Sequence, residues 1–182
     1  MKDKQIVILA APGESTNIVY HALKKDFNIA KVILEKPVDK KTFLKRRIKS
    51  LGLGTVIGQL LFKFLVIPGL EKQAEGRLRE IKASGSLSGA PIDREAILYV
   101  DSVNATATIE ALQQLKPDVI VVNGTRIISK KVLLSVSSPF INTHAGITPL
   151  YRGVHGGYWA LASNDLDHCG VTVHLVDPGI DT

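Results

Sequence analysis

The sequence predicts an α/β protein with a doubly wound, mainly parallel sheet and helices on both faces. The first observation is that short apolar runs rich in β-branched residues alternate with stretches whose apolar residues recur at helical spacing. The second is that the 182 residues are 45% hydrophobic and 22% charged, which is the composition of a folded domain. A chain of this length buries a core without disulfide or metal support.

The elements follow in chain order. Residues 5–11 (QIVILAA) are an apolar run of strand length, and the turn at 12–16 leads into a helix at 17–25 with Ser15 or Thr16 as its N-cap. Further strands are expected at 30–34, 97–100, 119–122, 140–144 and 170–176, and further helices at 106–115, 129–136 and 154–162.

A helical insertion is expected at about 36–90, within a single domain that spans 1–182. It contains a basic segment at 36–49, an apolar stretch at 51–70, a helix at 71–82 and a Ser/Gly loop at 83–91. Gln59, Lys63 and Pro68 interrupt the apolar stretch, which argues against a membrane-spanning helix. Packed helices, a lid over the acceptor site, a homodimer contact and a membrane-surface contact all remain open.

The positive charge is concentrated in one segment. Residues 36–49 hold seven basic residues and one acid, so their net charge equals the +6 of the whole chain. A solvated helix face explains such a cluster, and contact with RNA or an anionic membrane surface is the alternative.

Several function classes are excluded. The single cysteine, Cys169, rules out an intrachain disulfide and a Cys-rich zinc module, and we expect it to be a small packing residue.

We also expect Trp159 to lie in the core. The first residues resemble a strand more than a signal peptide, which favours a cytoplasmic location. No dinucleotide GxGxxG fingerprint follows the first strand.

Polar residues gather where strands are expected to end, which is where open α/β sheets bind ligands. Asn142 and His144 are two residues apart on one strand, so their side chains point to the same face. Asp181 follows the last strand, where it can face His144. The remaining candidates lie at Gly13, Ser15, Thr16 and Asn17, at 123–126, and from His174 onward.

Taken together, three stretches resemble the folate-dependent formyltransferase family. They read KPDVIVVNGTRIIS at 116–129, FINTHAGITPLYRGVHGGYWAL at 140–161 and GVTVHLVDPGIDT at 170–182. The matching features are a strand ending in N-x-H, a loop ending in proline, a Tyr-Arg-Gly turn, a strand, and a loop carrying an aspartate. The PGESTN turn at 12–17 is similar to the phosphate turn of glycinamide ribonucleotide formyltransferase.

The resemblance implies a Rossmann-like formyltransferase fold and roles for individual residues. The implied catalytic residues are Asn142, His144 and Asp181. The implied folate-binding residues are Arg126, Ile127, His174 and Asp177. The implied acceptor-binding residues are Gly13, Ser15, Thr16, Asn17, Tyr151, Arg152 and Gly153. Family members continue past the catalytic aspartate, so the chain is expected to be a catalytic domain truncated at its C-terminal end.

The implied reaction is formyl transfer from 10-formyltetrahydrofolate, without a metal, to a primary amine through a tetrahedral intermediate. Asn142 and His144 would donate to the oxygen on which negative charge develops. Asp181 and the imidazole would handle the amine proton. The expected acceptor is a small molecule, glycinamide ribonucleotide or a nucleotide-linked amino sugar. The alternatives are 10-formyltetrahydrofolate hydrolysis, methionyl-tRNA formylation and a non-catalytic binding module.

Overall fold

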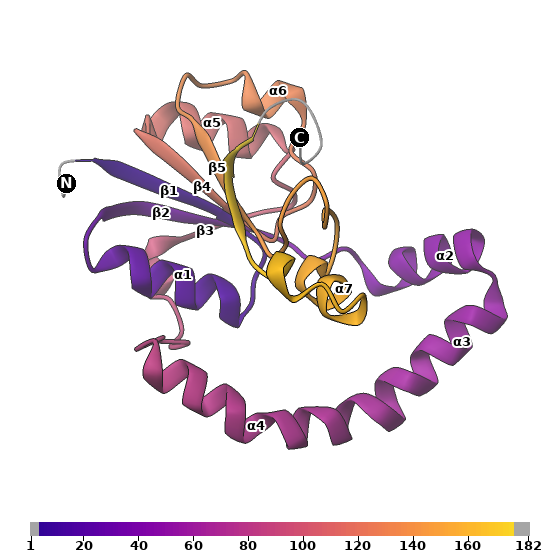
Figure 1. Ribbon diagram of the computed structural model, residues 1–182. Helices are drawn as coiled ribbons and strands as arrows, with labels where there is room; N and C mark the ends of the chain where they lie inside the picture. The colour runs from indigo at the N-terminus through magenta and orange to yellow at the C-terminus, as the bar shows by residue number, and fades with distance from the viewer. Residues whose placement is uncertain (1–3, 177–182) are drawn as a thin grey trace. The chain divides into compact units, whose positions relative to one another are not determined.

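The computed structural model describes residues 4–176, which divide into two compact units (Figure 1). The α/β unit consists of the chain up to Lys36 together with the chain from Gly89 onward. The helical unit is Pro37–Ser88. That a single catalytic domain spans the chain, with 36–90 inserted into it, stays a prediction.

The sheet of the α/β unit has six strands in the order β3-β2-β1-β4-β5-β6. The strands are β1 (Gln5–Ala10), β2 (Asn28–Glu35), β3 (Ile97–Val100), β4 (Val119–Asn123), β5 (Phe140–His144) and β6 (Thr172–Leu175). The pairs from β3 to β5 are parallel, and β6 runs antiparallel to β5 at the edge. The predicted mainly parallel α/β sheet is therefore confirmed.

Helices cover both faces of this sheet. Figure 1 shows α1 (Glu14–Lys24) on one face, and α5 (Thr106–Leu115) and α6 (Lys130–Leu133) on the other. The remaining helical segments are α7 (Gly156–Ala162) and the 3₁₀ turns η2 (Arg94–Ala96) and η3 (Leu166–His168). The helix predicted at 129–136 is thus a single short turn.

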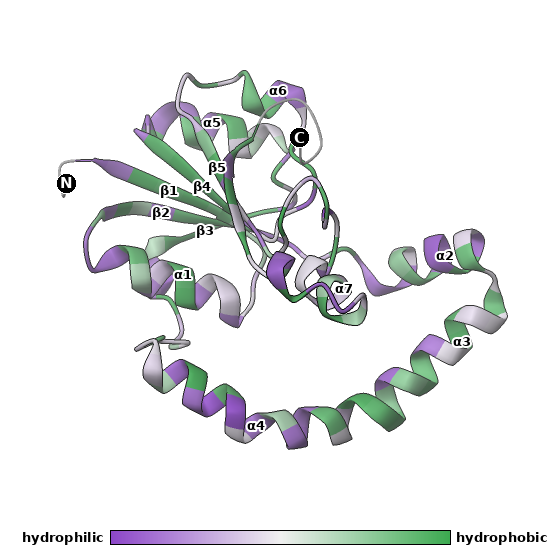
Figure 2. Cartoon of the chain, in the orientation of Figure 1, coloured by the Kyte–Doolittle hydropathy of each residue, from purple (hydrophilic) through white to green (hydrophobic). Residues whose placement is uncertain are grey.

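The alternation of side chains along the central strands builds two cores. Val7 and Leu9 of β1 face one way and pack with Leu112 of α5. Ile6 and Ile8 face the other way and pack with Tyr20 of α1. Since successive strand residues point to opposite faces, a strand covered by helices on both sides is apolar throughout. This is why the first strand has no polar alternation, and Figure 2 shows its apolar colouring.

Three local predictions were wrong. The first helix begins at Glu14 with Gly13 at the N-cap, and neither Ser15 nor Thr16 caps it. Trp159 is 56% exposed, because α7 buries Gly156 and Ala160 and turns the indole outward. Cys169 is also exposed, since it follows the 3₁₀ turn at the surface.

The helical unit consists of α2 (Lys40–Leu51), α3 (Leu53–Leu61), the π-helical turn η1 (Phe62–Val66) and α4 (Ile67–Ser84). Asp39 caps α2, where its carboxylate accepts from the Thr42 backbone N–H at 2.9 Å. From Leu53 to Ser84 the chain forms a continuous helix of 32 residues.

This helix is long and apolar enough to cross a membrane: its best 18-residue window has a mean hydropathy of 1.7, and 6% of that window is buried. The interruptions at 51–70 argue against a spanning helix, yet the helix itself continues through all three of them. The π turn ends at Val66, two residues before Pro68, and the Ile67 N–H bonds to the Phe62 oxygen five residues back. The wider turn accommodates a proline that has no N–H to contribute, so the helix continues.

Candidate active site

The candidate site lies in the α/β unit, at the carboxyl ends of three neighbouring strands. Ala10, at the end of β1, pairs with Asn123 at the end of β4, and Val122 of β4 pairs with Asn142 of β5. The turns after these strands therefore meet at one edge of the sheet. This edge is where open α/β sheets bind ligands.

Asn142 and His174 form the centre of the site. They stand opposite each other on β5 and β6, and the Asn142 Nδ2 lies 3.3 Å from the His174 Nε2. The His174 Nδ1 is 3.1 Å from the Leu175 carbonyl oxygen, which only accepts. The neutral ring therefore carries its proton on Nδ1, and its Nε2 accepts from the Asn142 amide. Both side chains are partly buried.

His144 lies on the same face, two residues after Asn142, and its pairing partner is Thr172. Its Nε2 is 3.2 Å from the Tyr151 carbonyl oxygen. Because that oxygen accepts, Nε2 carries the proton and Nδ1 is the acceptor of the neutral ring. The structure thus brings Asn142, His144 and His174 to one face of the β5–β6 pair, and the two-residue spacing predicted this for Asn142 and His144.

The loop after His144 is held by close backbone packing. A Cβ atom on Gly146 or on Gly156 would overlap the Tyr151 carbonyl oxygen and the other glycine. The Thr172 hydroxyl donates to the Gly146 oxygen at 2.9 Å and accepts from the Thr148 N–H at 3.1 Å. Only glycine allows this approach at the two positions. The loop is thereby fixed beside the imidazole.

The Tyr151 side chain is anchored by two residues that sequence reasoning missed. Its hydroxyl donates to Asp165 Oδ2 at 2.8 Å, and the other oxygen of Asp165 is 2.7 Å from the His168 Nδ1. Hydrogen bonds from His168 and then Tyr151 lower the pKa of Asp165, and the bond to Asp165 raises the pKa of Tyr151. The sequence signal that could have indicated this contact is the spacing of Asp165 and His168, an acid and a histidine three residues apart. Arg152 and Gly153 are exposed in the adjoining turn.

The turn after β1 is tied to β4. The Asn123 amide donates to the Thr16 hydroxyl at 2.9 Å and contacts the Ser15 hydroxyl at 3.3 Å. The Asn17 amide donates to the Gly89 carbonyl at 3.1 Å. Since Gly13 provides no side chain at the N-cap, the first turn of α1 presents its N–H groups next to the exposed residues 12–15.

Arg126 follows β4 and is held by another residue that sequence reasoning missed. The buried Glu35, at the end of β2, accepts from the Arg126 N–H at 2.7 Å and from the Val103 N–H at 3.2 Å. The Arg126 Nε is 3.5 Å from the same carboxylate. Ile127 beside it is exposed, and its carbonyl accepts from Asn104 at 2.9 Å. Asn104 thus fixes the backbone of this loop.

Asp177 and Asp181 lie outside the described residues, so the geometry of the predicted trio rests on Asn142 and His144. Between residues 4 and 176, no group of three or more His, Cys, Asp or Glu side chains is arranged to hold a metal ion.

The sequence is similar to those of several known proteins. A sequence model of the family described as formyl transferase matches residues 65–182, which is more than half of the chain. The methionyl-tRNA formyltransferase of Methylacidiphilum infernorum is 35% identical over 126 residues, which are 64% of this chain and 37% of that protein. That of Pelobacter propionicus is 36% identical over 87 residues, or 47% of this chain and 27% of that protein. The chain therefore spans about a third of the length of these relatives.

Solved structures show the same fold. The phosphoribosylglycinamide formyltransferase of Streptococcus pneumoniae has a TM-score of 0.57 and 18% identity, covering 98% of this chain and 77% of that one. A formyltetrahydrofolate deformylase of Pseudomonas syringae has a TM-score of 0.52 and 14% identity, covering 98% of this chain and 47% of that one. At such identities the similarity is one of fold.

Proposed function

The chain belongs to the formyl transferase family, and from this premise we propose that it transfers the formyl group of 10-formyltetrahydrofolate to a primary amine. One observation supports this most strongly. Asn142, His144 and His174 stand on one face of the β5–β6 pair, with the Asn142 amide 3.3 Å from one imidazole. An amide donor and two histidines at the carboxyl edge of the sheet are suited to acyl transfer.

In the proposed reaction the amine nitrogen bonds to the formyl carbon, and the bond from that carbon to the folate nitrogen breaks. Asn142 donates to the oxygen on which negative charge develops, and His144 is placed to donate or accept beside it. The proton leaving the amine passes to Asp181 or His144, and an equivalent proton is returned to the departing nitrogen. We assign this role to Asp181 from its position in the sequence motif.

The formyl donor supplies the transferred carbon, and we propose that the loop after β4 and the end of β6 hold it. Arg126 and Ile127 lie on a loop whose backbone is fixed by Glu35 and Asn104. An exposed apolar side chain on such a rigid loop fits contact with an aromatic ring. His174 belongs to this set through its pairing with Asn142, and Asp177 belongs to it by sequence position.

For the acceptor we propose a small phosphate-bearing amine, either glycinamide ribonucleotide or a nucleotide-linked amino sugar. The N–H groups at the start of α1 support this choice, because a helix N-terminus favours an anion. Gly13, Ser15, Thr16 and Asn17 form this phosphate-side group. Tyr151, Arg152 and Gly153 form the amine-side turn, of which Tyr151 is anchored through Asp165.

The test is formyl transfer to each of these acceptors, with tetrahydrofolate formation as the readout. Asn142→Ala removes a donor to the developing charge and is expected to lower kcat about 10²–10³-fold. Thr143→Ala is the matched control, since Thr143 is exposed on the opposite face of the same strand. Equal activity of the two variants would contradict the role of Asn142.

The alternative functions predict different results in the same assays. Formate release without any amine identifies a hydrolase. Turnover of only a methionine-charged tRNA identifies that polymer as the acceptor. Folate binding that survives His144→Ala without any turnover identifies a binding module.

A further inference from the structure

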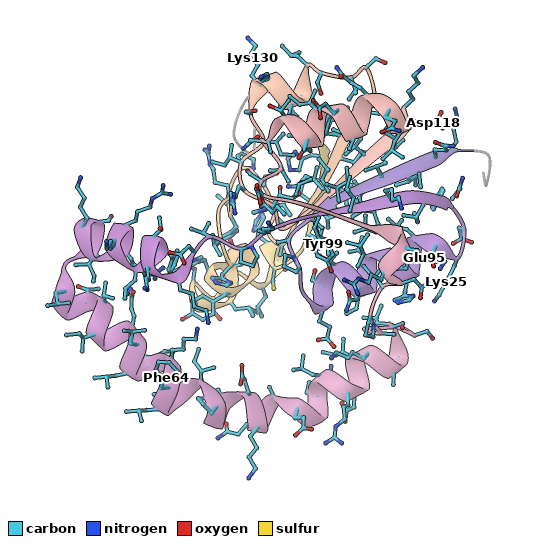
Figure 3. The ribbon with its side chains drawn as sticks, turned by 180° about the vertical axis from the view of Figure 1, so that it is seen from behind. Lys25, Phe64, Glu95, Tyr99, Asp118 and Lys130 are labelled. Carbon is cyan, nitrogen blue, oxygen red and sulfur yellow. The ribbon has the colours of Figure 1, made fainter. Side chains whose placement is uncertain are left out.

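The helical unit presents an apolar face that its own helices leave uncovered. Along α3 and into η1, Leu53, Ile57, Leu60, Leu61 and Phe64 recur at helical spacing, so they share one side of the helix. Their exposed fractions run from 40% at Leu60 to 69% at Phe64. Figure 2 shows the apolar stretch along this helix, and Figure 3 labels Phe64 on it.

The other side of the same helix is polar and meets the basic helix. Thr55, Gln59 and Lys63 follow one another at spacings of four residues and therefore form a stripe. The Arg47 Nε of α2 donates to the Gln59 Oε1 at 2.7 Å. The basic helix thus lies against the polar stripe, and the apolar face points away from it.

The charge on this part of the unit has a single sign. Residues 40–70 contain seven basic residues and no acid. The cations are Lys40, Lys41, Lys45, Arg46, Arg47, Lys49 and Lys63. A second copy of the chain would bring the same positive charge to the interface, whereas an anionic surface complements it.

We propose that the helical unit binds the surface of an anionic lipid bilayer. The helix formed by α3 and η1 lies in the interface with its apolar face toward the acyl chains, and α2, on its polar side, holds its long cationic side chains at the level of the headgroups. A wide apolar face beside a Lys/Arg-rich polar side is the pattern of interfacial helices. This inference is independent of the proposed reaction, since no residue of the candidate active site takes part in it.

Connectivity favours the surface over a span. The helical unit leaves the sheet after β2 and returns before β3, and these two strands pair with each other. A single crossing by the helix would require a second crossing by 37–52, which contains six basic residues. Lys63 and Gln59 would also have to enter the hydrocarbon core.

The test is cosedimentation of the 182-residue chain with two kinds of vesicle, one of phosphatidylcholine alone and one containing phosphatidylglycerol. Binding is expected to the second kind and to weaken as salt is raised. Replacing Lys45 and Arg46 by Gln is expected to weaken partitioning about fivefold for each charge removed. Replacing Lys130 and Lys131 of α6 by Gln is the matched control and is expected to leave binding unchanged.

The apolar face is tested by Phe64→Ser with Leu61→Ser, which is expected to weaken partitioning about tenfold or more. Leu134→Ser is the matched control, because Leu134 and Phe64 are each 69% exposed. Phe64→Trp in a Trp159→Phe background provides a direct probe. Its emission is expected to shift to shorter wavelength with anionic vesicles, and brominated lipids are expected to quench it.

Three results would overturn the proposal. Equal binding to both kinds of vesicle would show that lipid charge plays no part, and binding to neither would show that the unit does not bind a bilayer. RNA binding that is insensitive to the Phe64 and Leu61 changes, without vesicle binding, would assign the basic helix to nucleic acid. Concentration-dependent dimerisation lost in the Phe64→Ser/Leu61→Ser variant, again without vesicle binding, would assign the face to a second copy.

Discussion

The carbonyl oxygen of Tyr151 determines which nitrogen of the His144 ring carries its proton. The backbone oxygen 3.2 Å from Nε2 only accepts, so the neutral ring keeps Nδ1 as its acceptor. The Leu175 carbonyl fixes His174 in the opposite tautomer in the same way. The identities and spacing of these histidines are legible in the sequence. Their tautomers are not, because they depend on backbone oxygens that only the folded loop brings near.

The loop beside His144 gives the first stability prediction. Gly146→Ala places a Cβ against the Tyr151 carbonyl oxygen, and the backbone must move to relieve the overlap. We expect a loss of about 1–3 kcal/mol in the free energy of unfolding, measured by urea titration. Gly157→Ala is the control, since its Cβ would meet only the Cys169 Sγ at 3.8 Å. A Gly146→Ala variant as stable as this control would contradict the steric argument.

Asp165 gives a prediction for pH dependence. Hydrogen bonds from His168 and Tyr151 lower its pKa in the folded state below the ordinary 3.8. A carboxyl with a lowered pKa contributes stability that is present above its unfolded pKa and lost as the pH falls through its folded pKa. The stability difference between the parent chain and Asp165→Asn is therefore expected at neutral pH and should vanish in acid below 3.8.

The measurement is urea unfolding of both proteins across that pH range. A difference that persists unchanged into strong acid would show that the carboxylate charge is not its source. Asp167→Asn, on the same 3₁₀ turn, is the matched control.

At the scale of elements, Glu35, the last residue of β2, is bonded to two segments that follow other strands. Its buried carboxylate accepts from the backbone after β3 and from the loop after β4. We expect Glu35→Ala to lower the free energy of unfolding by about 3–5 kcal/mol, because buried N–H groups and Arg126 lose their partner. Arg126→Ala should cost less, since the buried acid keeps both N–H donors. Equal costs in urea titration would contradict this division.

The elements themselves were largely predictable, because strands covered on both faces are apolar throughout and the helices between them are periodic. Residues 97–100, 106–115 and 140–144 have the predicted bounds. The predicted N-cap of α1 was wrong, because the Ser15 and Thr16 hydroxyls bond to Asn123 at the end of β4. Glu35 was missed for the same reason. Its partners are far away in sequence, and no local pattern marks it.

At the scale of the whole molecule, the two core clusters defined by the described residues draw only on the α/β unit. We therefore expect the chain with 37–88 replaced by a flexible Gly/Ser linker to unfold cooperatively at nearly the same urea midpoint. The near-UV circular dichroism of the α/β unit should also persist. Loss of the cooperative transition would show that the sheet needs the helical unit to fold.

The family, too, was predictable at this scale, since its motifs follow one another along the last third of the chain. The character of the helical unit was harder to predict. Gln59, Lys63 and Pro68 argued against a membrane-spanning helix, but they do not end the helix. The outcome depended on a backbone adjustment, the π turn, that composition does not encode.

That π turn also changes the direction in which the following side chains point around the helix axis. It accommodates one residue more than an α-helical turn, so every side chain after Val66 is rotated by about 100° from its position on an uninterrupted helix. A helical wheel drawn with one phase from Leu53 to Ser84 would therefore mix two faces. The length of the segment Phe62–Val66, more than its composition, sets the direction in which the charged residues of α4 point. Deleting a single residue there would rotate that whole charged half about its own axis while leaving its sequence intact.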